Sequence, residues 1–110
     1  MMQDILTAVF GTNHRRSRFP APPAGTYAVW TDDVEVDGPD YPDDAAPMIY
    51  RHAVTVEVYE PRPDDAAEAA LEAVLRRYGM KWHKQDRYWI KTEQLYQTIY
   101  EFEYIEKRRN

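Results

Sequence analysis

The chain has 110 residues, of which 44% are hydrophobic and 14% aromatic, and its formal net charge is −5. This apolar share is too high for intrinsic disorder, and a chain of this length can build one modest core. The acidic balance disfavours sequence-specific binding of nucleic acid, and the absence of cysteine excludes disulfides and thiolate metal sites. Because no apolar run reaches the length of a membrane span, we expect one soluble domain over residues 1–110 with no membrane partner.

The first predicted element is a short amphipathic helix. Apolar residues recur at helical spacing from Met2 to Phe10, and Gly11 follows as a residue that ends helices. Residues 12–25 contain three prolines, a glycine and three arginines, so we expect a flexible, extended connector there.

Two strands are predicted next, over residues 26–36 and 49–60, because both segments are rich in β-branched and aromatic residues. Residues 37–48 separate them and contain three prolines and one glycine. Such a segment cannot form a tight hairpin, so we expect a long flexible loop.

The second predicted helix covers residues 64–78, with Asp65 and Glu68 at capping-box spacing and Gly79 after its end. Short strands are predicted at 81–84 and 87–91, with a turn at Gln85 and Asp86 between them, followed by a long strand at 95–105. On the last strand one face should carry Tyr96, Tyr100, Phe102 and Tyr104, and the other Gln97, Glu101 and Glu103. Together these elements predict an α+β fold, with an antiparallel or mixed sheet of about four to five strands and two helices on one face.

Catalytic and cofactor motifs are scarce in this sequence. Ser17 is the only serine and lies in the predicted connector, and four scattered glycines form no phosphate-binding loop. His14, His52 and His83 occur singly and are interpreted as surface or sheet-face histidines. We therefore expect no catalytic residue, no cofactor and no metal.

The acidic stretch from Asp32 to Asp44 leaves one alternative open. Its spacing partly follows that of a calcium loop, but Glu35 at the third place, the prolines and the flanking strands argue against that site. The alternative function is a small ligand-binding domain that uses this loop in a cation-dependent way. We otherwise interpret Asp37, Asp40, Asp43 and Asp44 as part of an assembly loop.

Aromatic residues exceed what a core of this size can hide, and exposed Tyr and Trp on a sheet are typical interface anchors. We therefore expect a contact surface between subunits. Its predicted residues are Trp30, Tyr41, Tyr59, Trp89, Tyr96, Tyr100 and Tyr104. Arg15, Arg16 and Arg18 form a basic cluster, which could make only a weak contact with a phosphate backbone.

The order of these features resembles a known family. It comprises an N-terminal helix, YAVW opening a strand, an acidic loop, and then YRHAVTVEVYEPRPDD, LEAVLRRYG and RYWIKTEQLYQTIYEFEY. In this order the chain resembles the small tail-completion, or tail-terminator, proteins of siphophages and prophages over residues 27–107. The HRRSRFPAPPAG segment is more basic and richer in proline than is typical of that family, and we interpret it as an extended arm.

The resemblance implies a virion structural protein without enzymatic activity. Such proteins form a ring, commonly of six copies, at the head-proximal end of the tail tube, where they stop tube elongation and allow head-tail joining. The implied partners are further copies of the chain, the tail tube protein and the head-tail connector protein. The implied location is the tail of the virion, with the host cytoplasm before assembly. A stopper or adaptor protein of the connector is the alternative within the virion.

Overall fold

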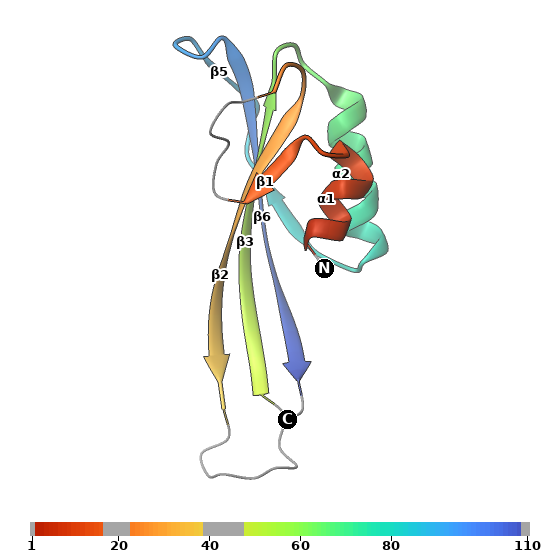
Figure 1. Ribbon diagram of the computed structural model, residues 1–110, viewed down its shortest axis with the longest axis vertical. Helices are drawn as coiled ribbons and strands as arrows, with labels where there is room; N and C mark the ends of the chain where they lie inside the picture. The colour runs from red at the N-terminus through yellow and green to blue at the C-terminus, as the bar shows by residue number, and fades with distance from the viewer. Residues whose placement is uncertain (1, 17–22, 39–47, 109–110) are drawn as a thin grey trace.

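The computed structural model describes residues 2–16, 23–38 and 48–108. They form two helices and six strands, and Figure 1 shows both helices on one side of a long sheet. The predicted α+β class is confirmed, although the sheet has six strands where about four to five were expected. The helices are α1 (Met2–Phe10) and α2 (Asp65–Arg77), and the strands are β1 (His14–Arg16), β2 (Tyr27–Asp37), β3 (Met48–Glu60), β4 (Trp82–Lys84), β5 (Tyr88–Ile90) and β6 (Leu95–Arg108).

Three long strands form the centre of the sheet, with β3 antiparallel to β2 on one edge and to β6 on the other. Both registers are continuous. Tyr27 lies opposite Tyr59 at one end of the β2–β3 pair, and Asp37 lies opposite Ile49 at the other. The three long strands predicted from the sequence are thus confirmed, with boundaries shifted by three residues at most.

The short strands differ from the predictions in two places. Residues 14–16 are not a free connector, because β1 pairs in parallel with β2 and the Ala28 N–H donates to the Asn13 carbonyl at 3.0 Å. The predicted turn at Gln85 and Asp86 does not reverse the chain. Since β3 occupies one edge of β6, β4 and β5 follow each other along the other edge. The Gln85 N–H donates to the Ile99 carbonyl at 2.9 Å between them and keeps the chain on that edge.

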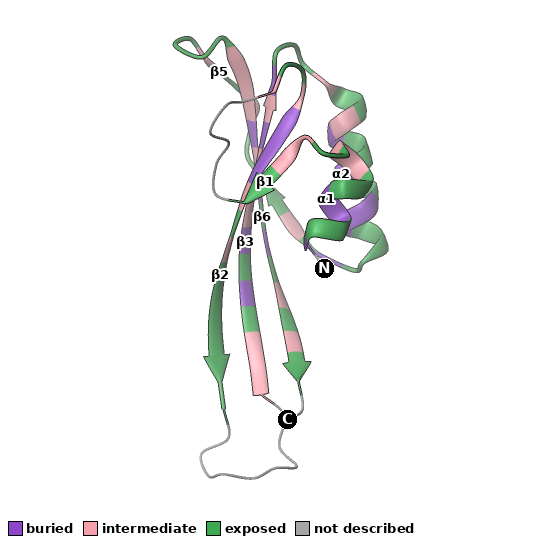
Figure 2. Ribbon diagram, in the orientation of Figure 1, coloured by how far each residue is buried: buried purple, intermediate pink, exposed green. Residues whose placement is uncertain are grey.

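The core lies between the helices and one face of the sheet. Side chains alternate along a strand, and the even-numbered residues of the three long strands face the helices. The predicted alternation on β6 is confirmed, since Tyr100 and Phe102 are buried while Glu101 and Glu103 are exposed. Figure 2 shows that the buried residues gather where the helices cover the sheet. The main core members are Ile5, Leu6, Ala28, Val54, Val56, Val58, Leu71, Leu75, Tyr100 and Phe102.

Helix α2 begins at a different cap from the one predicted. The Asp64 side chain accepts hydrogen bonds from the Ala67 N–H at 3.0 Å and from the Thr26 hydroxyl at 2.6 Å, so Asp64 is the N-cap. The predicted capping box of Asp65 and Glu68 is therefore wrong, because Glu68 lies on the buried side of the helix.

Two carboxylates, Glu60 and Glu68, are buried between α2 and the sheet. Glu60 is fully buried and accepts hydrogen bonds from the Asp64 N–H at 2.6 Å and the Thr98 hydroxyl at 3.3 Å. Burial raises the pKa of Glu60 to about 7, and the neighbouring Glu68 adds to the rise. Burial also disfavours ionisation of Glu68, but hydrogen bonds from Arg87 and Lys84 outweigh it and lower the pKa of Glu68. The pair thus holds one carboxyl proton close to neutral pH.

The sheet extends well beyond the helices. The radius of gyration is 16.3 Å, whereas a compact chain of this length has about 13 Å. Figure 1 shows the cause, a three-stranded projection made by the ends of β2, β3 and β6. We call this projection the arm and define it as residues 33–37 of β2, 48–53 of β3 and 103–108 of β6. It is a different part of the chain from the HRRSRFPAPPAG segment, and the name is used below for the projection alone.

Candidate functional site

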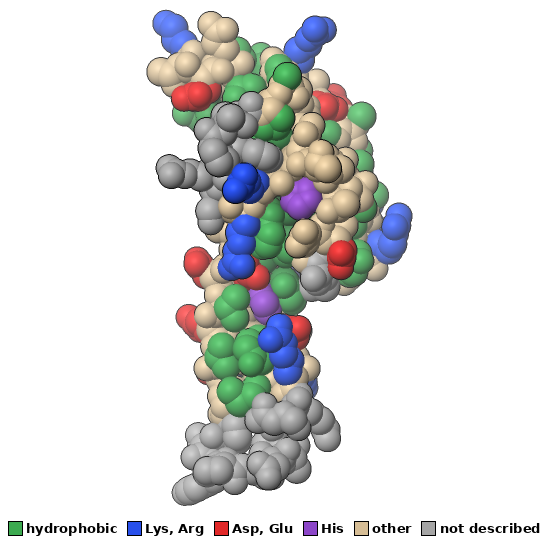
Figure 3. Space-filling model, viewed as in Figure 1, with side chains coloured by type: hydrophobic (Ala, Val, Ile, Leu, Met, Phe, Trp, Pro, Cys, Tyr) green, Lys and Arg blue, Asp and Glu red, His purple; other side chains and the backbone are tan. Residues whose placement is uncertain are grey.

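The arm is the part of the sheet that the two helices leave uncovered (Figure 1). Its strands continue the register of the covered sheet, with Asp33 opposite Ala53 and Ala53 opposite Glu103, but neither helix reaches it. Large apolar side chains are consequently left in solvent: Val34 is 42% exposed, Val36 49% and Ile105 59%. Figure 3 shows hydrophobic side chains on the arm among acidic and basic ones. Val34 and Val36 lie on the helix-side face of the arm and Ile105 on the opposite face, so both faces expose apolar side chains that a partner could cover.

A buried histidine ties the three strands together at the base of the arm. His52 Nδ1 lies 2.8 Å from Asp32 Oδ2, and His52 Nε2 lies 3.1 Å from Glu106 Oε1. The ring stacks on Tyr104 with centroids 4.2 Å apart. Both ring nitrogens thus lie within hydrogen-bond distance of carboxylate oxygens, which only accept hydrogen bonds. Both ring nitrogens are then occupied, so His52 is arranged as a structural link and not as a general base.

Exposed pairs continue this pattern toward the end of the arm. Arg108 donates a hydrogen bond to Glu106 at 2.8 Å, and this bond helps to lower the pKa of Glu106. The Arg108 guanidinium also lies over the Tyr50 ring, 4.4 Å from its centroid. On the opposite face, Arg51 donates to Asp37 at 2.8 Å. Such exposed pairs add little stability, so the arm depends mainly on its backbone ladder and on His52.

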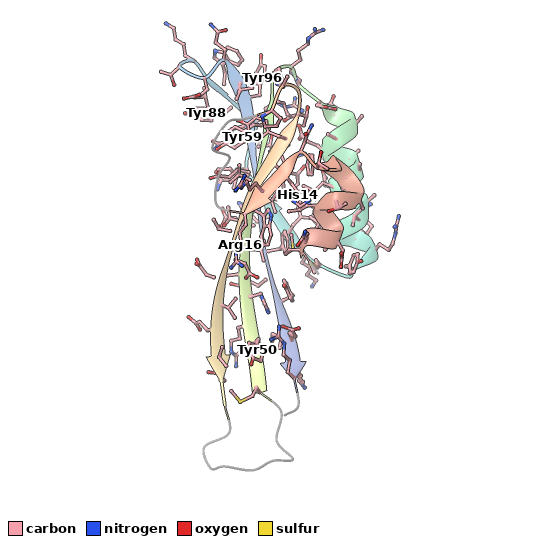
Figure 4. All side chains as sticks on the ribbon, in the orientation of Figure 1. His14, Arg16, Tyr50, Tyr59, Tyr88 and Tyr96 are labelled. Carbon is pink, nitrogen blue, oxygen red and sulfur yellow. The ribbon has the colours of Figure 1, made fainter. Side chains whose placement is uncertain are left out.

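The other end of the sheet carries an aromatic cluster. Tyr27 and Tyr59 stack at 5.1 Å, and Trp89 and Tyr96 are 4.8 Å apart and tilted. Tyr88 is 58% exposed beside them. Figure 4 shows Tyr59, Tyr88 and Tyr96 at the end of the molecule opposite to Tyr50. The exposed Tyr88 and Trp89 therefore lie far from the arm, whose Tyr50 is half-buried.

The predicted interface residues are divided between these places and the core. Trp89 is exposed and Tyr96 half-buried in the aromatic cluster, and Tyr104 is half-buried at the base of the arm. Tyr100 is fully buried and donates its hydroxyl hydrogen bond to Glu72 at 2.8 Å, so it belongs to the core and not to an exposed surface. Its even-numbered position on β6, between buried residues of the same parity, indicates that it is buried.

Two further predicted interface residues are half-buried. Trp30 packs against the core with the Arg16 guanidinium 5.4 Å from its ring. Tyr59 donates to Glu57 at 3.1 Å and accepts from Gln97 at 3.0 Å, and burial raises the pKa of its hydroxyl to about 12.

Several predicted residues cannot be placed. Tyr41, Asp40, Asp43 and Asp44 of the proposed assembly loop, and Arg18 of the basic cluster, lie outside the described residues. Arg15 and Arg16 are exposed on β1, and Arg16 also donates to the Asp32 carbonyl at 3.4 Å. Asp37 closes β2 beside Arg51.

The predicted interface residues do not include the apolar residues of the arm. In the run TDDVEVD, Val34 and Val36 alternate with acids, which places both on one face of the strand. The segment is part of the predicted strand over residues 26–36 and of the acidic stretch, and the same alternation also predicts an apolar face.

Residues 2–16, 23–38 and 48–108 contain no group of three or more His, Asp or Glu side chains that could hold a metal ion. Within the same residues, no helix is long and apolar enough to cross a membrane. The described residues offer instead a projecting surface with exposed apolar side chains (Figure 1).

Comparison with known protein families and with curated proteins gives no match. Among solved structures, the chain is similar in fold to a chain of the virion of a native gene transfer agent particle. The TM-score is 0.55 at 17% sequence identity, and the likeness covers 94% of this chain and 83% of the other. At this identity the likeness establishes a shared fold, which extends over nearly the whole chain.

Proposed function

We propose that this chain is a virion structural protein of a phage or prophage particle and acts in tail completion. In this proposal, copies of the chain form a ring at the head-proximal end of the tail tube, which ends the tube and joins it to the head. The observation that carries the proposal is the fold shared with a chain of a gene transfer agent virion over 94% of this chain.

The arm supplies a physical reason for assembly. Val34, Val36 and Ile105 are exposed beyond the reach of both helices, and their burial against a partner would be favourable by about 25 cal/mol for each Å² covered. An elongated subunit with an uncovered projection is suited to side-by-side packing, whereas a catalytic domain would be expected to form a pocket with converging polar groups. We infer that the arm contacts other subunits in the ring.

Charge is consistent with a ring through which DNA passes. The face of the sheet away from the helices carries six acidic residues on the three long strands, against the basic Arg51 and Lys107. A surface with this balance repels phosphates and would not retain DNA that moves past it. The six are Asp33, Glu35, Asp37, Glu57, Glu101 and Glu103.

The partners proposed for the ring are the tail tube protein and the head-tail connector protein, with six copies of the chain as the expected number. The proposed location is the tail of the virion, reached from the host cytoplasm during assembly. A stopper or adaptor would bind the connector but not the end of the tail tube, so binding to isolated tubes separates the two roles.

The first test is light scattering over a concentration series, combined with negative-stain images of the purified chain alone and mixed with tail tubes. We expect rings, alone or on tube ends. Val36→Glu should weaken assembly, because it places a charge among the apolar residues of the arm. The control is Ala73→Glu, which adds the same charge at an exposed position of α2 and should leave assembly unchanged. A chain that stays monomeric and ignores tube ends would contradict the proposal.

A further inference from the structure

Both outer strands of the arm have a free backbone edge. β1 pairs only with residues 28–30 of β2, and the Arg16 side chain donates to the Asp32 carbonyl just beyond it, so the part of this edge beside which nothing described lies is residues 33–37. β4 pairs only with residues 100–102 of β6, so residues 103–108 are likewise unpaired on the edge away from β3, as far as the chain is described. Free edges of this length are templates for pairing with another chain.

The hydrogen bonds beside the arm show which residues present their backbone groups to these edges. The Ala28 N–H bonds outward to Asn13, so even-numbered residues of β2 point their N–H and C=O groups to the free edge. The Ile99 carbonyl accepts from Gln85, so the odd-numbered residues of β6 point to its free edge. Because β2 and β6 both keep an uninterrupted register with β3, the same alternation of outward residues continues to the end of the arm. The outward residues of the free edges are Val34 and Val36 on β2, and Glu103, Ile105 and Lys107 on β6.

The two edges differ in charge. Asp33, Glu35 and Asp37 alternate along the β2 edge without any Lys or Arg, so two β2 edges would repel each other. Residues 103–108 of β6 carry Glu103 and Glu106 together with Lys107 and Arg108, so the charges on this edge balance. The charges therefore favour an unlike pair of edges over two β2 edges.

The directions of β2 and β6, and the space beside β6, also suit a pair of unlike edges. β2 and β6 are both antiparallel to β3, so they run parallel to each other on opposite sides of the arm. A depression of about 480 Å³, lined by residues 78–81 and 103–105, lies beside the β6 edge and leaves room for the side chains of an added strand.

We propose that the β2 edge of one copy pairs in parallel with the β6 edge of the next copy. This inference rests on the proposed ring and states how its subunits are joined. The contact uses different surfaces on the two partners, so a rotation that closes gives the proposed ring, in which no arm edge is left free. The partner at each edge is thus a second copy of this chain.

Disulfide trapping tests the pairing, because the chain has no cysteine of its own. Glu35 and Ile105 project from the same face of the sheet, the face away from the helices. Glu35→Cys is combined in turn with Glu103→Cys, Ile105→Cys or Lys107→Cys, since a disulfide needs Cα atoms about 4.4–6.8 Å apart and one of the three registers should meet this. After oxidation, one double variant should give a ladder from dimer to ring on a non-reducing gel, while each single variant stays monomeric on the same gel. Dimers from Ile105→Cys alone would show β6 paired with β6 and would overturn the proposal.

Proline substitution gives an independent test. Ile105→Pro removes an outward N–H and leaves the ladder with β3 intact, and edge strands tolerate proline at such positions. Ile105→Thr shortens the apolar side chain but keeps the N–H. We expect the proline variant to raise the dissociation constant for assembly at least about tenfold over the threonine variant, while both unfold as cooperatively as the parent chain.

The outcomes separate this inference from the proposed function. Rings that persist in Ile105→Pro and give no ladder with any double variant would overturn edge pairing and leave the ring itself standing. Absence of rings in the parent chain, alone and on tail tubes, would overturn both.

Discussion

The buried carboxylate Glu60 makes a sharp prediction about stability and pH. It is fully buried, accepts hydrogen bonds from the Asp64 N–H and the Thr98 hydroxyl, and lies close to Glu68. Replacing it by glutamine keeps the shape of the protonated acid and removes the possibility of ionisation. We expect Glu60→Gln to be nearly neutral at pH 5 and stabilising at pH 8.

The magnitude follows from the pKa of Glu60, which burial raises from 4.5 to about 7. Between these values the folded chain holds a proton that the unfolded chain has released. The free energy of unfolding therefore falls by up to about 1.4 kcal/mol per pH unit as pH rises through this window. The total loss is roughly 3 kcal/mol and levels off above about pH 7. Glu60→Gln has no such carboxyl and should escape most of it.

The assay is urea unfolding, followed by circular dichroism, at pH 5 and pH 8. Glu103→Gln is the control, because it removes an exposed carboxylate from the same sheet and should shift stability little and equally at both pH values. If Glu60→Gln instead lowers the free energy of unfolding at pH 8, Glu60 is ionised and stabilised by Arg87, which lies 3.7 Å away, and the reasoning above is refuted.

Three further predictions concern single side chains. His52→Gln should cost about 1–3 kcal/mol and speed hydrogen exchange in the arm while core amides are unaffected, because the side-chain contacts that join the three strands are lost. Arg51→Gln, which removes an exposed pair, should change stability by less than about 0.5 kcal/mol. Leu75→Ala should lower the free energy of unfolding by about 2–5 kcal/mol in thermal denaturation, since this side chain is fully buried, and a loss below about 1 kcal/mol would contradict its place in the core. Asp64→Ala should cost about 1 kcal/mol in urea unfolding through loss of the N-cap, and Asp65→Ala should cost less if Asp64 is the true cap.

Periodicity predicted most of the fold. Alternation along residues 49–60 and 95–105 identified two long strands and their buried faces, because side chains on a strand alternate between the two faces of the sheet. The apolar spacing of the helices likewise located α1 and α2, with Gly11 and Gly79 just after their ends. These signals are local in sequence, so a single sequence contains them.

Features that depend on distant partners were not predictable in the same way. β1 exists because β2 offers an edge to residues 14–16, and nothing in HRR itself predicts a strand. The buried position of Glu68 depends on Arg87 and Lys84, which reach it from the segment around β4 and β5. The candidate site was predictable only in part, since aromatic residues were expected at the surface, while the free edges follow from where β1 and β4 stop.

The arm and the covered part of the sheet differ in what can hold them together. In the covered part, Val54, Val56 and Tyr100 pack under the helices, and the ladder is protected from water. The arm has the same ladder but no second layer, and a sheet usually needs a packed apolar face to be stable. Its one buried polar link is His52, at the base. The arm should therefore become ordered when subunits associate. A partner that covers Val34 and Val36 also supplies the packed layer or added strand that the arm lacks in a single copy. Hydrogen exchange in the arm should slow on ring formation far more than exchange in the core, because only the arm gains protection from its neighbour.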